Sequence, residues 1–266
     1  MRQHRLALCE VHYPEWFVAQ AQRAIEKYRM FSPEDRMLVA VSGGKDSLAL
    51  WDVLLRLGYR ADGLYIDLGI DGSAGYSAAS RAKAEQFAAE RPDARFTVAG
   101  LRTEYGETLP KVARRVRRGR SKPCSVCGLI KRHVMNRVTR EGGYDVLATG
   151  HNLDDEVAVL FGNVLHWQTG YLTRQAPVLA ASPGHGNEDG GLARKVKPFC
   201  RLHERETAAY TLIAGIDYIY DECPHAVGAT SLRHKDVLNR IEEQSPGTKL
   251  QFYLGFLRAR KEGFFC

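Results

Sequence analysis

The sequence predicts an α/β fold in which a parallel β-sheet carries helices on both faces. Short apolar runs alternate with segments whose apolar residues recur at the helical period. Two polar turns, at residues 42–47 and 149–156, each follow an apolar run and lead into a helix-like segment. Such alternation is typical of βαβ units, which build parallel sheets covered on both sides.

The apolar periods place the elements of this sheet along the first two thirds of the chain. We expect helices where apolar residues return every three or four positions, and strands where they form short continuous runs. The predicted order is helix 14–30, strand 37–41, helix 47–57, strand 61–67, helix 78–90, strand 95–98, helix 128–141, strand 144–149 and helix 153–165.

Residues 168–198 interrupt the pattern, because they are rich in Gly and Pro and show no clean periodicity. We expect a long loop or flap there, mobile before substrate binds. Beyond it the sequence predicts a helix at 204–213, a strand at 218–220 and a helical C-terminal extension made of two amphipathic helices at 232–244 and 249–261.

Composition and charge favour a protein without a membrane segment and with an anionic partner. No apolar run approaches the roughly 20 residues that span a bilayer, and the N-terminus lacks the apolar core of a signal peptide, so we expect a cytoplasmic location. The chain carries 38 Lys and Arg against 31 Asp and Glu, a net charge of +7. Residues 111–122, KVARRVRRGRSK, hold seven of these cations and no acid. A solvated basic face and a contact with nucleic-acid phosphates both fit this run, and we favour the phosphate contact.

A phosphate site is indicated by the turn at residues 42–47, which reads Ser42-Gly43-Gly44-Lys45-Asp46-Ser47. Its spacing matches neither G-x-x-x-x-G-K-[ST] nor the dinucleotide motif G-x-G-x-x-G. Two glycines let the backbone approach an anion, two serines offer hydroxyls, and a helix N-terminus follows. Asp46 would repel phosphates unless Mg²⁺ lies between them, so it suits a metal contact or the geometry of the loop. A plain glycine-rich turn is the alternative to this pyrophosphate cradle.

The six cysteines favour metal or catalytic chemistry, because the chain has no secretory signal. Cys124 and Cys127 have the spacing of metal ligands, and Lys131 lies one helical turn further on. A zinc site would need four ligands, whereas the distant Cys223 completes a three-thiolate set that suits a [4Fe-4S] cluster with one open iron. The alternative is an unligated, buried Cys223, and Cys200 is expected to serve packing.

The second turn, Thr149-Gly150-His151-Asn152-Leu153-Asp154-Asp155-Glu156, ends a predicted strand and begins a helix. Asn152 or a neighbouring acid can cap that helix. The carboxyl ends of parallel strands meet at one edge of the sheet, so the acids face the first loop, where they would hold Mg²⁺ or order a nucleotide. A capping role alone is the alternative.

Four stretches together resemble a known family: S-G-G-K-D-S, C-S-V-C-G, A-T-G-H-N-L-D-D-E and the C-terminal stretch that begins CPHAVGATSLRHKDVL. They resemble, over nearly the whole chain, the TtcA/TtuA family of tRNA 2-thiolation enzymes, closest to the TtuA type. The resemblance implies a Rossmann-like PP-loop ATP pyrophosphatase domain and an oxygen-sensitive [4Fe-4S] cluster on Cys124, Cys127 and Cys223. Catalytic roles are implied for Asp46, Lys131 and Asp155. The implied contacts with ATP and Mg²⁺ come from Ser42, Gly43, Gly44, Lys45, Asp46, Ser47, Gly150, His151 and Asp155.

The resemblance also implies a reaction and its partners. The uridine O2 of a tRNA would be adenylated with release of pyrophosphate, and sulfur delivered through the cluster would replace AMP. The target would be 5-methyluridine of the T loop, and the donor a small ubiquitin-like protein with a C-terminal thiocarboxylate. A homodimer is one assembly that we consider. The alternatives are wobble-uridine thiolation, an iron-sulfur RNA-binding protein without turnover, and an amide-forming ligase, which would use neither the cysteines nor the basic run.

Members of the TtuA type usually carry zinc fingers at both ends, and this sequence departs from that pattern. Cys9 and His12 resemble half of the first finger, and Cys266 resembles the start of the second. Because so few ligands cannot hold a structural zinc, we expect no complete zinc site. The predicted units are an N-terminal helix with a finger remnant at 1–30, the PP-loop domain at 31–222, and a helical segment at 223–266.

Overall fold

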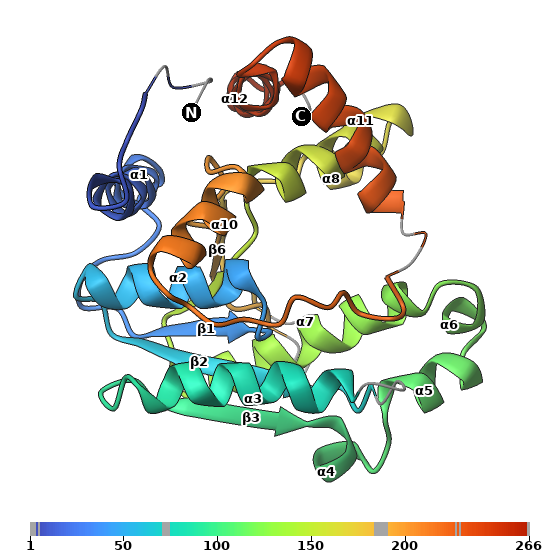
Figure 1. Cartoon of the computed structure of the whole chain (residues 1–266). Coiled ribbons are helices and arrows are strands. Elements are labelled where there is room, and N and C mark those ends of the chain that lie inside the picture. Colours follow the sequence, from blue (N-terminus) through green and yellow to red (C-terminus); the bar gives the residue numbers. More distant parts are fainter. Residues whose placement is uncertain are drawn as a thin grey trace.

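The computed structural model describes residues 4, 6–70, 75–183, 191–226, 228 and 230–264, without the side chains of Arg118 and Ser121. Its centre is a six-stranded sheet in the order β3-β2-β1-β4-β6-β5 (Figure 1). Strands β1, β2, β3, β4 and β6 are parallel, and β5 runs antiparallel at one edge. The strands are β1 (Met37–Val41), β2 (Ala61–Asp67), β3 (Phe96–Gly100), β4 (Val146–Thr149), β5 (Val178–Leu179) and β6 (Lys195–Val196).

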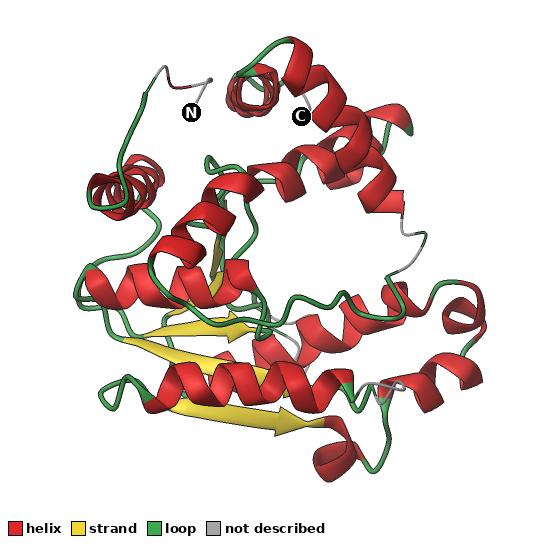
Figure 2. Ribbon diagram, viewed as in Figure 1, coloured by secondary structure: helices red, strands yellow, loops and turns green. Residues whose placement is uncertain are grey.

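Helices surround this sheet, as the colouring in Figure 2 makes plain. They are α1 (His12–Tyr28), α2 (Lys45–Arg56), α3 (Tyr76–Ala89), α4 (Leu101–Tyr105), α5 (Leu109–Arg115), α6 (Arg117–Ser121), α7 (Pro123–Glu141), α8 (Leu153–Leu165), α9 (Thr169–Leu172), α10 (Glu204–Ile213), α11 (Thr230–Gln244) and α12 (Thr248–Lys261). None of the described helices is long and apolar enough to cross a membrane.

Alternation along the strands sends apolar side chains to both faces of the sheet. In β1, Val39 and Val41 join the core formed with α1, α2, α3 and α10, whereas Leu38 joins the core under α7. Leu64 of β2 and Leu147 of β4 lie on the α7 side as well. Both faces are therefore buried, which is why these strands read as continuous apolar runs. The predicted α/β fold, with a parallel sheet covered on both faces, is confirmed.

The order of the strands creates one point where a ligand can enter. The chain moves from β1 to β2 and β3 on one side, and then returns to place β4 on the other side of β1. The loops that leave the carboxyl ends of β1 and β4 therefore diverge, and a crevice forms between them. Both polar turns singled out in the sequence leave the sheet at this crevice.

Two predictions about secondary structure are wrong. The described part of the segment at 168–198 is not a plain loop, because it contains the short α9 and the strands β5 and β6, and residues 184–190 of the predicted flap lie outside the described residues. Two-residue strands are too short to show any periodicity in a sequence. The described residues 218–220 form no strand, and the Ile219 amide instead donates a hydrogen bond of 2.9 Å to the carbonyl oxygen of Gly43.

The helix predicted at 128–141 begins earlier than expected, at Pro123, so Cys124 and Cys127 lie in its first turns. Proline is well suited to this position, since the first amide of a helix has no intrahelical acceptor. The preceding basic run was not predicted to be helical, but it forms most of α5 and α6.

The last two helices pack on α8 rather than on the sheet (Figure 1). His234 of α11 meets Phe161 of α8 edge to face, with ring centroids 5.4 Å apart. Tyr253 and Phe256 of α12 are buried in the same core as α8. The C-terminal helices thus cover the segment that follows β4 and reach toward the crevice.

Candidate functional site

A cavity of about 330 Å³ lies at the crevice between β1 and β4. Its walls come from the two polar turns, from β2 and the chain that follows it, from α7, and from the segment that leads to α11. Apolar side chains such as Leu64, Ile66 and Met135 line part of the wall. Nine of the predicted site residues line it too: Ser42, Asp46, Ser47, Cys127, Lys131, Gly150, His151, Asp155 and Cys223.

The remaining predicted site residues, Gly43, Gly44, Lys45 and Cys124, do not line this cavity. The two glycines shape the loop instead. Gly43 has φ +75°, and a Cβ there would lie 2.1 Å from the carbonyl oxygen of Ser80, so only glycine fits. Within the loop the Ser42 amide donates to Ser47 Oγ at 3.0 Å, and that hydroxyl donates to the carbonyl oxygen of Gly44 at 2.9 Å.

The second turn approaches the first almost to backbone contact. A Cβ on Gly150 would come 2.7 Å from the carbonyl oxygen of Asp46, so this position also needs glycine. Asn152 donates through Nδ2 to Asp46 Oδ1 at 3.1 Å, which joins the two turns through side chains.

The same Asn152 caps helix α8, as the sequence predicts. Its Oδ1 accepts from the Asp155 amide at 3.1 Å, and the Asp155 carboxylate accepts from the Asn152 amide at 3.2 Å. This reciprocal pair satisfies two amides at the helix start and fixes the Asp155 backbone. Asp155 also lines the cavity, so capping is not the only role open to it.

Electrostatics make the Asp46 carboxyl a receptive site for a cation. Burial raises the pKa of Asp46, and the nearby carboxylates of Asp155 and Glu204 raise it further, against the opposing charge of Lys45. A divalent cation placed between Asp46 and Asp155 would relieve this repulsion. Carboxylate oxygens are the ligands that Mg²⁺ prefers, so the donor set fits that ion.

Lys45 is turned away from the cavity by two carboxylates. Its Nζ lies 2.7 Å from Glu204 Oε1 and 3.1 Å from Asp46 Oδ2. The prediction that Lys45 contacts a phosphate therefore requires this ammonium to leave Glu204.

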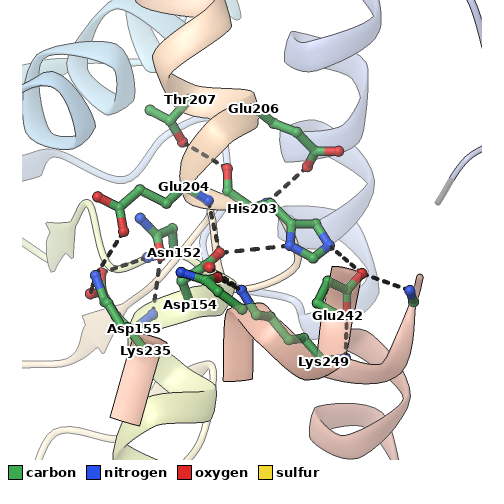
Figure 3. A network of polar contacts seen from close by, with 12 residues as sticks. Asn152, Asp154, Asp155, His203, Glu204, Glu206, Thr207, Lys235, Glu242 and Lys249 are labelled. Atoms are coloured by element: carbon green, nitrogen blue, oxygen red, sulfur yellow. Dashed lines mark hydrogen bonds and ion pairs between the residues drawn. The ribbon is translucent and has the colours of Figure 1, made fainter. Parts of the chain in front are cut away.

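Two residues that the sequence motifs did not reveal complete this cluster of charges. Glu204 begins α10, and Lys235 of α11 lies 2.9 Å from Glu204 Oε2 and 2.7 Å from Asp155 Oδ1 (Figure 3). Burial would raise the pKa of Glu204, but the ammonium groups of Lys235 and Lys45 outweigh it and lower that pKa to about 2. Glu204 belongs to none of the stretches quoted above, and Lys235 lies in the C-terminal stretch that carries the resemblance but was given no role there.

The other two acids of the second turn do not face the cavity, so the expectation of paired acids there is wrong for them. Asp154 is buried and accepts from Lys249 Nζ at 2.5 Å and from the Glu204 amide at 2.8 Å (Figure 3). Glu156 is buried against Lys197 Nζ at 2.7 Å. On a helix, positions 154 and 156 point away from the side that Asp155 presents to the cavity.

The three cysteines lie near one another at the N-terminus of α7. Cys127 and Cys223 line the cavity, while Cys124 is exposed and its Sγ donates to the carbonyl oxygen of His225 at 3.1 Å. Burial raises the pKa of the Cys127 thiol, the charge of Lys131 opposes this, and Cys223 and Cys124 raise it further. In the described ranges, no three His, Cys, Asp or Glu are already arranged as a metal-ligand set. Three thiols that lie near one another have the donor chemistry of an iron-sulfur site.

Lys131 and His151 also line the cavity. Lys131 of α7 projects into the cavity beside Cys127. His151 is exposed to the cavity, yet the surrounding protein desolvates its ring, and this desolvation, with the charges of Lys195 and Lys197, lowers its pKa to about 3. His151 is therefore neutral at physiological pH and acts as a hydrogen-bonding group, with Nδ1 2.9 Å from Thr149 Oγ1.

The remaining cysteines have separate environments. Cys200 is fully buried in the core, as expected for a packing role. Cys9 Sγ lies 3.0 Å from His12 Nδ1 at the surface, and hydrogen bonds from His12 lower the pKa of that thiol to about 7. Cys266 lies outside the described residues.

Comparison with known sequences relates the chain to tRNA-modifying enzymes. It is 52% identical to the tRNA-5-methyluridine(54) 2-sulfurtransferase of Thermus thermophilus over 257 residues, which are 97% of this chain and 76% of that protein. The proteins of the same name from Pyrococcus horikoshii and Thermotoga maritima are 42% and 39% identical, over 97% and 98% of this chain and 78% and 82% of their own. No family model matches the chain.

Comparison with solved structures shows a shared fold. The U34-tRNA thiolase NcsA from Methanococcus maripaludis, a structure with its [4Fe-4S] cluster, matches with a TM-score of 0.80 over 98% of this chain and 84% of that chain. The sequence identity is 21%, so this likeness concerns the fold alone. It agrees with the predicted α/β fold built on a parallel sheet.

Proposed function

This chain belongs to the TtcA/TtuA family of tRNA 2-thiolation enzymes, and from that premise we propose that it catalyses ATP-dependent 2-thiolation of a tRNA uridine. The uridine is the 5-methyluridine of the T loop, since the three relatives cited above are named for that base. One observation carries the proposal: a single cavity is lined by residues of the phosphate loop (residues 42–47), by two of the three cysteines and by Lys131.

The first step activates an oxygen that is a poor leaving group. The uridine O2 attacks the α-phosphorus of ATP, an O–P bond forms, and the bond to pyrophosphate breaks. Loop amides and the hydroxyls of Ser42 and Ser47 bind the phosphates at the N-terminus of α2. Asp46 and Asp155 would hold Mg²⁺, and Lys131 stabilises charge that develops on the transferring phosphoryl group.

The second step exchanges oxygen for sulfur without a net redox change. Sulfur at the sulfide level adds to C2, the C2–O bond breaks, and AMP carries the former O2 away. Cys124, Cys127 and Cys223 would hold a [4Fe-4S] cluster, which would supply a binding site for that sulfur. A small ubiquitin-like protein with a C-terminal thiocarboxylate is our proposed donor. Lys131 can act in both steps, because it lies near Cys127 and lines the same cavity as the loop at residues 42–47.

The tRNA reaches this cavity across a basic surface. Arg114, Arg117 and Arg120, on or beside α5 and α6, are exposed at the side of the molecule where α7 presents its cysteines (Figure 1). Such a surface binds phosphates and releases counterions, which makes the affinity depend on salt. The target base must leave its stack to enter the cavity.

Iron analysis after anaerobic purification tests the assignment of the cysteines. We expect a brown protein with about four irons per chain, and loss of both colour and iron in Cys223→Ala. Cys9→Ala is the matched control, because Cys9 is exposed and distant from the cavity, and it should keep its iron. An iron-free wild-type protein, or a Cys223→Ala variant with full iron content, would overturn the assignment.

A further inference from the structure

We propose that Lys235 is a positioning residue of this active site, which fixes Asp155 and gives Glu204 a second cation so that Lys45 can leave for the phosphates of ATP. The inference rests on the proposed function, because it assumes that ATP binds at the loop after β1. It concerns Lys235 of the C-terminal helix α11, which was not among the site residues predicted from the sequence.

The geometry places Lys235 between two carboxylates. Its Nζ lies 2.7 Å from Asp155 Oδ1 and 2.9 Å from Glu204 Oε2, and only 18% of the side chain is exposed. Burial alone would lower the pKa of Lys235, but the charges of Asp155 and Glu204 outweigh this effect and raise that pKa. Lys235 is therefore charged at physiological pH, and it holds the free end of the Asp155 side chain, whose other oxygen accepts from the Asn152 amide.

A chain of alternating charges connects this helix to the phosphate loop. Asp155, Lys235, Glu204, Lys45 and Asp46 follow one another, with ion-pair distances of 2.7, 2.9, 2.7 and 3.1 Å. Three carboxylates face two ammonium groups, so one negative charge remains unbalanced. Asp46 and Asp155, the two ends of this row of ion pairs, line the cavity. The magnesium ion of a bound nucleotide would supply the missing positive charge there.

Arrival of the nucleotide changes the competition for Lys45. Triphosphate oxygens carry more negative charge than Glu204 and attract the ammonium that Glu204 now holds. Glu204 can release it only because Lys235 remains as a partner, since a partly buried carboxylate without a cation is costly. In the absence of Lys235, Glu204 would compete with ATP for Lys45.

Helix α11 is held firmly enough to place Lys235. Helix α11 packs along α8, and Lys249 of α12, which ion-pairs with Asp154 beside Asp155 (Figure 3), also donates a hydrogen bond to Asn239 of α11. His234, next to Lys235 in the chain, packs on Phe161 of α8. Removal of the Lys235 charge therefore leaves the packing of α11 in place.

The test separates the two roles by steady-state kinetics and by titration with a non-hydrolysable ATP analogue. In Lys235→Met we expect the KM for ATP and the analogue Kd to rise about tenfold, because Glu204 retains Lys45. We expect kcat to fall about tenfold as well, because Asp155 loses its anchor. Lys235→Arg keeps the charge, so its ATP affinity and its kcat should each be partly restored.

The double variant Lys235→Met/Glu204→Gln distinguishes positioning from general damage. A neutral amide in place of the Glu204 carboxylate would release Lys45, so the KM and the analogue Kd should return toward the wild-type values while kcat stays low. Independent, additive losses in the double variant, or an unchanged KM and kcat in Lys235→Met, would overturn the proposal. The matched control is Arg240→Met, which removes an exposed cation from the same helix and should leave analogue binding unchanged.

Two further readouts keep the result decisive. If Lys235→Met does not fold, Glu204→Gln alone decides, because it should bind the analogue at least as tightly as the wild type, and weaker binding would refute the competition for Lys45. A wild-type protein that binds the analogue but forms no AMP with tRNA would refute the proposed function, yet the analogue titrations would still test Lys235.

Discussion

Gly150 lies so close to Asp46 that a methyl group on its Cα would stand 2.7 Å from the Asp46 carbonyl oxygen and 3.0 Å from the Ser47 amide nitrogen. The two turns that follow β1 and β4 therefore touch through their backbones, with Asn152 as an additional link at 3.1 Å. This contact sets the distance between the phosphate loop and Asp155. The site depends on how these two loops fit together as much as on its charged side chains.

Substitution of Gly150 by Ala tests this contact. The added methyl group must push the Asp46 backbone away, and overpacking of this kind costs about 1–3 kcal/mol. We expect weaker ATP binding by at least about tenfold, measured by calorimetry, because the loop amides no longer converge. Gly255→Ala is the control, since nothing lies within 4 Å of its Cβ in helix α12, and it should bind ATP normally. Equal ATP affinity in both variants would refute the role of the backbone contact.

Removal of the Asp46 carboxylate tests its assignment to Mg²⁺. We expect Asp46→Ala to abolish tRNA-dependent AMP formation, with a loss of about a hundredfold or more, because the phosphates would lose their bound cation. Asp93→Ala removes an exposed carboxylate elsewhere and should leave the rate unchanged. The measurement is the release of AMP from labelled ATP in the presence of tRNA. Unchanged turnover in Asp46→Ala would remove Asp46 from the mechanism.

The pKa of Glu204 predicts a pH-dependent contribution to stability. Its pKa falls from the ordinary 4.5 to about 2 in the fold, so the ionised form stabilises the native state. That contribution is complete above about pH 4.5 and disappears as the pH falls toward 2. The side chain is 36% exposed, so after solvent screening we expect Glu204→Gln to cost about 1 kcal/mol at pH 7.

Thermal unfolding between pH 7 and pH 3 checks this expectation. The difference in Tm between the wild type and Glu204→Gln should narrow as the solution becomes more acidic. Glu34→Gln, at an exposed position, should show no such trend. A difference for Glu204→Gln that widens toward low pH would contradict the assigned ion pairs.

The exposed arginines of α5 and α6 should account for part of the salt dependence of tRNA binding. Arg114 and Arg117 are exposed, and in the part of the chain that the structure describes neither has an acidic partner, whereas Arg115 pairs with Glu107. Arg114→Gln/Arg117→Gln should reduce the slope of log K against log salt by about 2, because each phosphate contact contributes about one unit.

The matched control removes two exposed cations from α1, in Arg23→Gln/Lys27→Gln. This pair lies on the far side of the molecule from α5 and α6 (Figure 1). Filter binding at several salt concentrations gives both slopes. Equal slopes for the wild type and the arginine variant would make residues 111–122 a plain solvated face.

Local patterns in the sequence sufficed to predict the sheet and the two polar turns. Val39, Leu64 and Leu147 lie in buried strands, and such strands leave continuous apolar runs that a sequence shows directly. The phosphate loop and the acidic turn are contiguous motifs, so they could be recognised without a structure. The crevice between them follows from the strand order that parallel βαβ units impose.

Features that depend on distant parts of the chain could not be predicted. The partners Asp155 and Lys235 are 80 positions apart, and no local pattern marks either of them as a member of a pair. The strands β5 and β6 are two residues long and owe their form to the edge of the sheet. The orientation of Lys45 toward Glu204 likewise depends on where α10 docks, which only the folded structure reveals.

Mass spectrometry of nucleosides tests the central claim most directly. A tRNA that carries the 5-methyluridine of the T loop but no 2-thio group would be incubated anaerobically with the iron-loaded protein, ATP, Mg²⁺ and a sulfide source, and then digested. We predict that the 5-methyluridine of the T loop gains the mass of one oxygen-to-sulfur exchange, together with one AMP and one pyrophosphate per modified base. A 5-methyluridine that gains no sulfur in the presence of the loaded enzyme, or sulfur incorporation that does not require ATP, would contradict the account.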